Sequence, residues 1–97
     1  MITSAGLNSM ATAVKNLIAG GTYTIGGVTK DIPLFSTAIN ANTLVVQLYL
    51  DDSVAGTVTK FQLKGYDGTI LADRPDNVVK TSLKGLLVIF TIVIQEV

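Results

Sequence analysis

The sequence contains no histidine, cysteine or tryptophan, and charged residues make up only 14% of its 97 positions. Without histidine, no side chain titrates near neutral pH at its ordinary pKa, and no imidazole can bind a metal. Without cysteine, thiolate nucleophiles, zinc fingers, iron–sulfur clusters and disulfide bonds are excluded. These absences remove most of the residue combinations on which enzymes depend. We therefore predict a protein that is not an enzyme, with no catalytic residues, no cofactor and no metal site.

The low charge is a second deficit. Soluble domains carry about 25% charged residues on average, whereas here seven basic residues are balanced by seven acidic ones. A protein alone in solution usually keeps a charged surface, so the composition indicates that something covers much of this one: a membrane, copies of the same chain or a larger assembly. Balanced charge also provides no electrostatic attraction for nucleic acid, and we predict no nucleic-acid partner.

A membrane is the weakest of these explanations. The most apolar run covers residues 86–94, is interrupted by Thr91 and is rich in β-branched side chains. A spanning helix needs about 20 apolar residues, so this run fits a buried strand better. Residues 1–21 have neither a basic leader nor a continuous apolar stretch, and no secretory signal is expected. We expect no membrane insertion, and assembly becomes the leading explanation for the missing charge.

Residues 3–19 are predicted to form the helix of this protein, because apolar residues recur there at helical spacing. Thr3 or Ser4 can cap its start, and Gly20-Gly21 can end it with a residue at positive φ. The apolar face fits two interpretations: packing on the chain's own sheet, or a helix–helix contact between subunits. The residues of this face are Leu7, Met10, Val14 and Leu17.

After residue 21 the apolar period changes from helical to two. Glycine-containing turns at Gly26-Gly27 and Asp67-Gly68 predict two hairpins. We read residues 31–42 as an irregular connection and residues 74–77 as a turn. Strands are predicted over residues 22–25, 28–31, 44–50, 57–64, 70–73, 78–81 and 86–95. The predicted fold is mainly β: a single domain (1–97) with an N-terminal amphipathic α-helix (3–19) and a small antiparallel β-sandwich of about six or seven strands (22–97).

The last predicted strand, also the longest, is apolar on both faces, which is typical of a strand between two packed layers or at a subunit contact. We therefore assign intersubunit contacts, as a hypothesis, to one face of this strand together with the apolar face of the helix. On the strand these residues are Leu86, Val88, Phe90 and Ile92.

Two groups of polar residues suggest other functions. Asp51, Asp52 and Asp67 are the densest acidic positions, but a calcium site needs six to eight converging oxygens and their spacing matches no calcium loop. Asp-Gly is also fully explained as turn chemistry. Tyr23, Tyr49 and Tyr66 could stack on sugars. A small carbohydrate- or cell-surface-binding β-sandwich module is therefore the alternative from another class, and buried tyrosines would exclude it.

Two parts of the chain carry a distinctive succession of short motifs. The first is Ile2-Thr3-Ser4-Ala5-Gly6-Leu7-Asn8, followed by a helix and a glycine pair. The second is the succession of residues 44–51, 55–59, 66–72, 79–81 and 86–94. Together these stretches cover roughly two-thirds of the chain. They resemble small tail proteins and tail-fibre N-terminal domains of tailed bacteriophages. The segment Thr22-Tyr23-Thr24-Ile25-Gly26-Gly27 departs from the T-H-I-A-x-G-x-G pattern that is frequent in that family.

The resemblance implies a non-enzymatic structural protein of the virion, assembled in the host cytoplasm and located in the tail, baseplate or fibre-attachment region. Its implied partners are copies of itself, as a trimer or hexamer, and other virion proteins. A capsid decoration or neck protein is a variant that the sequence does not separate from this one.

Overall fold

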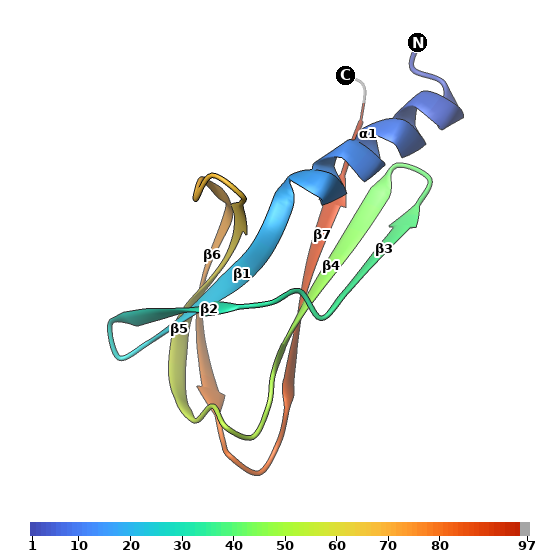
Figure 1. Cartoon of the computed structure of the whole chain (residues 1–97). Helices are drawn as coiled ribbons and strands as arrows, with labels where there is room; N and C mark the ends of the chain where they lie inside the picture. Colours follow the sequence, from blue (N-terminus) through green and yellow to red (C-terminus); the bar gives the residue numbers. More distant parts are fainter. Residues whose placement is uncertain (96–97) are drawn as a thin grey trace.

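A helix that continues directly into a strand begins the fold. The computed structural model describes residues 1–95, and α1 (Ser4–Leu17) is its first element (Figure 1). The Thr3 side chain accepts a hydrogen bond from the Gly6 N–H at 3.0 Å, which caps one of the free N–H groups at the helix start. Ile18 already has extended backbone (φ −88°, ψ 114°). The predicted helix is therefore confirmed, but it ends two residues early and does not end at the glycine pair.

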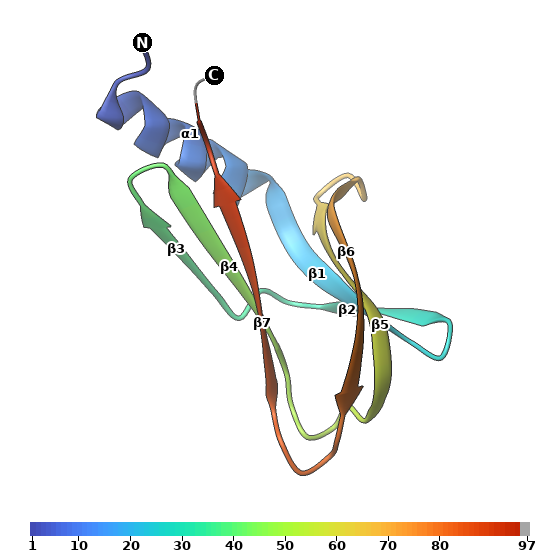
Figure 2. The same cartoon turned by 180° about the vertical axis from the view of Figure 1, so that it is seen from behind.

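The strands of the described chain form two antiparallel sheets, as predicted for a mainly β fold with an N-terminal helix. One sheet has the order β2-β1-β5-β6 and the other has the order β3-β4-β7 (Figures 1 and 2). The four-stranded sheet contains β1 (Ile18–Ile25), β2 (Val28–Ile32), β5 (Gly56–Gly65) and β6 (Ile70–Lys80). The three-stranded sheet contains β3 (Ser36–Asn40), β4 (Thr43–Leu50) and β7 (Leu86–Val93).

Tight hairpins join strands within a sheet, and longer connections cross between the sheets. Gly26 and Gly27 make the β1–β2 turn at φ 59° and 78°, a region that favours glycine. The β5–β6 hairpin turns at residues 66–69, with Gly68 at φ 86°. Both hairpins confirm the sequence prediction. The chain passes from one sheet to the other between β2 and β3, between β4 and β5, and between β6 and β7 (Figure 2).

Three sequence predictions about strands are wrong. Residues 36–40, expected to lie in an irregular connection, form β3 and pair with β4. Residues 74–77, expected to form a turn, lie inside β6, which runs through Pro75 as an edge strand. The final strand ends at Val93 and not at residue 95. It is also not the longest strand, since β6 is longer.

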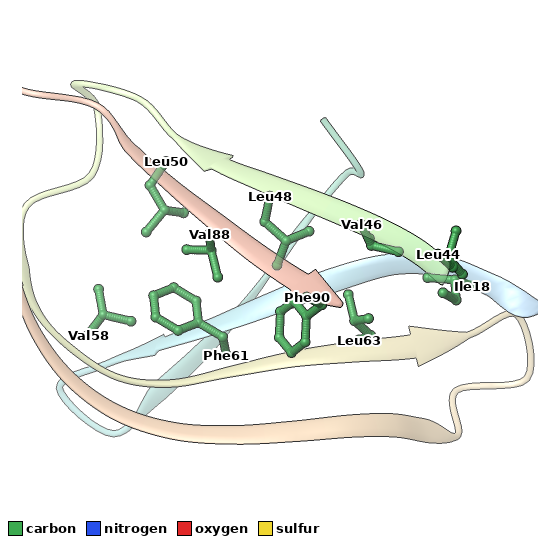
Figure 3. Packing of buried hydrophobic residues seen from close by; sticks show 10 residues of the cluster. All are labelled: Ile18, Leu44, Val46, Leu48, Leu50, Val58, Phe61, Leu63, Val88 and Phe90. Carbon is green, nitrogen blue, oxygen red and sulfur yellow. The ribbon is translucent and has the colours of Figure 1, made fainter. Parts of the chain in front are cut away.

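The core lies between the two sheets and is filled by alternate residues of their facing strands (Figure 3). In β4 the even-numbered residues are buried and the odd-numbered ones are not, as the period of two predicts. Phe61 and Leu63 of β5 face them, again as predicted. Figure 3 shows the complete buried cluster: Ile18, Leu44, Val46, Leu48, Leu50, Val58, Phe61, Leu63, Val88 and Phe90.

Gly21 is explained by sheet packing. It lies within β1, opposite Leu63 of β5, and not in a helix-ending turn. A Cβ atom at this position would lie 2.6 Å from Leu48 Cδ1 and 3.1 Å from the Gln62 carbonyl oxygen. Since carbon atoms in contact are normally about 3.5–4.0 Å apart, only glycine allows β1 to approach β4 this closely.

Helix α1 packs against β3, β4 and β1 at one end of the sandwich (Figure 1). Ala11 is its fully buried residue, and Leu7 and Val14 are half-buried beside it. Met10 and Leu17 remain 44% and 59% exposed. The predicted apolar face is therefore divided: part of it packs on the chain's own sheets, and the part containing Met10 and Leu17 is open.

Candidate interaction surface

Among the described residues, the outer face of the three-stranded sheet carries no charged side chain. The strand register places alternate residues of β3, β4 and β7 side by side on this face. Its apolar members on β7, Leu87, Ile89 and Val93, are 45–53% exposed. We call this surface the neutral face. Its residues are Ser36, Ala38, Asn40, Thr43, Val45, Gln47, Tyr49, Leu87, Ile89, Thr91 and Val93.

The outer face of the four-stranded sheet is chemically different. Lys64 of β5 forms an ion pair with Asp31 of β2 at 2.7 Å. Gln62 accepts a hydrogen bond from the Thr22 hydroxyl and donates one to Asp73, each at 3.2 Å. Charged and hydrogen-bonded side chains therefore cover this sheet, and the neutral face is a property of one sheet only.

Strand β7 also forms a free edge of its sheet, because the sheet order places no described strand beyond it. In an antiparallel ladder, successive residues direct their N–H and C=O groups to opposite sides. The Ile94 N–H donates to Asn42 on the β4 side, whereas the Ile89 carbonyl accepts a hydrogen bond from Arg74 Nη1 at 2.8 Å. The odd-numbered residues of β7 thus present their backbone groups to the open edge, and Arg74 covers one carbonyl there.

The residues predicted to contact other subunits lie in several environments. Val88 and Phe90 are 2% and 7% exposed and belong to the core of this chain. Leu86 and Ile92 are half-buried and pack against the same core. These inward positions are occupied by the chain's own core, so the strand residues still able to meet a partner are the neighbouring Leu87, Ile89 and Val93. The sequence prediction missed them because both faces of this strand are apolar.

Aromatic and acidic residues line two neighbouring pockets beside the segment that crosses from β2 to β3. Two adjoining pockets of about 340 and 390 Å³ share Tyr23, Ser53 and Val54. We call them together the tyrosine groove. The first of these pockets is also lined by the end of β2, the segment that crosses to β3, and the end of β4. These residues are Asp31, Ile32, Pro33, Leu34, Phe35, Tyr49, Leu50 and Asp51.

The three tyrosines are separated by the fold. Tyr23 is half-buried and Tyr49 is 41% exposed, and both line the tyrosine groove. Tyr66 is 79% exposed, belongs to the β5–β6 turn and lines a separate pocket, which shares Leu34 and Phe35 with the groove. A carbohydrate-binding module would have been excluded if these tyrosines were buried, and none of the three is buried. Phe35, whose ring centre is 5.3 Å from that of Tyr49, is an aromatic residue of the groove that the sequence prediction did not identify.

The acidic residues do not converge on a point. Asp51 accepts hydrogen bonds from the hydroxyl and the N–H of Ser53, which lower the pKa of its carboxyl group. Asp67 accepts a hydrogen bond from the Thr69 N–H, which lowers the pKa of that carboxyl group. Within residues 1–95, no three acidic side chains are grouped so that they could hold a metal ion.

Comparison with known proteins yields no relative. No family model matches the chain, and no curated protein and no solved structure matches it. Over the described residues, the structure contains no helix that is long and apolar enough to cross a membrane. The function must therefore be argued from the surfaces described above.

Proposed function

We propose that this chain is a non-enzymatic structural subunit of a tailed-phage virion, which works by associating with copies of itself and docking on other virion proteins. The observation that carries self-association is the neutral face together with the free edge of β7. A face without charged side chains does not repel a second copy of itself. Charge depletion is also typical of the centres of protein interfaces.

The size of the neutral face indicates what kind of association to expect. With strands about 4.8 Å apart and about 3.4 Å per residue, strands of five, eight and eight residues have a footprint of roughly 340 Å². A standard interface buries about 800 Å² on each partner. The neutral face supplies less than half of this area, so we expect the β7 edge or the exposed part of α1 to contribute the rest.

The setting in a phage particle is supported by the sequence resemblance described above, over residues 2–8 and the five later segments. On this basis we propose a location in the tail, baseplate or fibre-attachment region, with a trimer or hexamer as the expected form. A capsid decoration or neck protein uses the same self-association and remains the alternative. Detection of this chain by mass spectrometry in purified phage particles tests the setting separately from the interface.

The interface is tested by measuring the molar mass in solution by light scattering coupled to size exclusion. We expect the wild-type chain to exceed its monomer mass of 10.2 kDa at micromolar concentration. Ile89→Glu places a charge at the centre of the neutral face and is expected to produce a monomer, because an unpaired charge is costly to bury. Leu83→Glu is the matched control, since Leu83 is 90% exposed in the turn before β7.

Each outcome has a meaning for the proposal. A wild-type chain that is monomeric at micromolar concentration contradicts self-association. If Leu17→Glu dissociates the oligomer and Ile89→Glu does not, the interface is the exposed part of α1 and the assignment to the neutral face is wrong. A well-dispersed NMR spectrum of each variant shows that the fold is retained.

A further inference from the structure

The two sheets end in four edge strands within the described residues, and three of these strands carry features that hinder pairing with another chain. Strand β2 has five residues, which include Lys30 and Asp31. Strand β3 also has only five residues. Strand β6 contains Arg74 and Pro75 and is paired with β5 through register shifts. Short strands, charges, proline and bulges are the means by which natural proteins protect the edges of their sheets.

Strand β7 has none of these features. It has eight residues, no charged side chain and no proline, and it pairs with β4 without a register shift. Arg74 of β6 donates to the Ile89 carbonyl at 2.8 Å. A carbonyl oxygen has two lone pairs, and Arg74 uses one of them, so the Ile89 carbonyl can still accept a hydrogen bond from another strand. Of the four edges, β7 is therefore the best suited to bind a further strand.

The backbone of β7 is complementary to that of a second β7 strand. The residues whose N–H and C=O groups face the open edge are Leu87, Ile89, Thr91 and Val93. In an antiparallel pair, Leu87 can lie opposite Val93 of the second copy, and Ile89 opposite Thr91 of the second copy. Each of these residues is then paired, and Phe90 lies opposite Phe90 of the second copy on a two-fold axis. A shift of this register by two residues leaves one of them unpaired.

The side chains of β7 also favour this pairing. On the neutral face it places Leu87 beside Val93 and Ile89 beside Thr91, and pairs of apolar and β-branched residues stabilise neighbouring strands. No side chain of β7 is charged, so two copies do not repel each other along the contact.

The pairing also enlarges the neutral face. Two copies joined at β7 combine their footprints into one surface of roughly 680 Å². This approaches the area of about 800 Å² that each partner buries in a standard interface, whereas a single neutral face does not. Pairing at β7 therefore gives the neutral face the size that docking requires.

From this geometry we propose that β7 binds the β7 strand of a second copy in the antiparallel register described above, and that the two three-stranded sheets become one. This inference rests on the self-association proposed for the chain and names the strand that makes the contact. Because the contact lies on a two-fold axis, it builds a dimer or a hexamer of three dimers, and it does not build a trimer.

A proline tests the backbone pairing without adding charge to the neutral face. The Thr91 N–H faces the open edge, so Thr91→Pro removes no hydrogen bond to β4. It removes the hydrogen bond from Thr91 to Ile89 of the second copy, once in each copy, and should raise the dissociation constant at least about tenfold. Thr91→Val keeps the N–H and should stay within about twofold of the wild-type value. Light scattering over a dilution series measures these dissociation constants.

A charge exchange tests the register. Ile89→Glu and Thr91→Lys should each weaken association, because each places an unpaired charge at the contact. In the double variant Ile89→Glu/Thr91→Lys, each glutamate lies opposite a lysine of the second copy, and association should be at least about tenfold tighter than in either single variant. Ile89→Glu/Thr91→Glu is the matched control, since it places like charges at the same positions and should restore nothing.

The outcomes separate this inference from the proposed function. A monomeric wild-type chain contradicts self-association as a whole. The β7 pairing alone is overturned if the wild-type chain is a trimer, or if folded Thr91→Pro associates as tightly as Thr91→Val. It is also overturned if Ile89→Glu/Thr91→Lys associates no better than its like-charge control, and this comparison decides the matter if Thr91→Pro does not fold. A dispersed NMR spectrum shows that a variant is folded.

Discussion

Gly21→Ala tests whether the two sheets pack as closely as the structure has them. The new methyl group would lie 2.6 and 2.7 Å from the two terminal carbons of Leu48, roughly 1 Å inside normal contact distance. Leu48 is fully buried, and the Gln62 carbonyl at 3.1 Å belongs to the backbone of β5, so neither can move away easily. Overpacking of this kind costs about 1–3 kcal/mol. Alanine restores about 0.4–1 kcal/mol by restricting the unfolded chain, which leaves a net loss of about 1–2 kcal/mol.

The double variant Gly21→Ala/Leu48→Ala makes the test specific. Leu48→Ala alone should cost about 2–5 kcal/mol because it leaves a cavity in the core. In the double variant the clash disappears and the new methyl group fills part of that cavity. The loss should therefore be smaller than the sum of the single losses, by about 1–2 kcal/mol. Urea unfolding followed by far-ultraviolet circular dichroism, at a fixed protein concentration, measures all three free energies.

Gly85→Ala is the matched control for this cycle. A Cβ atom there would collide with the Tyr49 hydroxyl even more closely than Gly21 Cβ collides with Leu48. Tyr49 is 41% exposed and can rotate its ring away, so we expect a change within about 0.5 kcal/mol. If Gly21→Ala is equally harmless, or if its effect adds to that of Leu48→Ala, the inferred close approach of β1 and β4 is wrong.

Two further substitutions address the β3–β4 turn and the β7 edge. Ala41 has φ 56° in the β3–β4 turn, so Ala41→Gly should raise the free energy of unfolding by about 0.5–1 kcal/mol, measured by urea unfolding; a decrease would contradict the strained turn. Arg74→Met removes the hydrogen bond to the Ile89 carbonyl and the guanidinium that lies 5.1 Å from the Phe90 ring centre. It should lower the free energy of unfolding by about 1–2 kcal/mol, and an unchanged value would show that Arg74 does not stabilise this edge.

Local turn chemistry made part of the fold predictable. Gly26-Gly27 and Asp67-Gly68 identified their hairpins because the residues at positive φ are glycines. The β3–β4 hairpin turns at Ala41 and Asn42, without a glycine, and β3 was therefore missed. The end of α1 was predicted two residues too late, because it depends on tertiary packing, which a local sequence pattern does not contain.

The position of β6 at the edge of its sheet explains why a turn was wrongly predicted inside this strand. Pro75 suggested a turn because proline cannot donate to a sheet ladder. Pro75 lies in β6, which is an edge strand, next to a register shift opposite residues 58–60. The open side of an edge strand has no ladder hydrogen bonds to lose, so a proline is tolerated there. Which face of β7 is buried was likewise not predictable, since the choice depends on its pairing with β4 and not on its own composition. The groove escaped prediction because it joins β1, the crossing segment and β4, which are distant in sequence.

The position of β7 in the chain has a consequence for how the protein is made. Its partner β4 is complete at Leu50, but β7 begins at Leu86, 36 residues later. At about 5–20 residues per second, a ribosome needs several seconds to synthesise this interval, whereas a hairpin forms in about 1–10 μs. For several seconds, therefore, the β4 edge of the β3–β4 hairpin has no partner strand, and the core lacks Val88 and Phe90. The core can close only after β7 has been synthesised, and until then the place beside β4 is open to any β7 strand, its own or that of a neighbouring nascent chain.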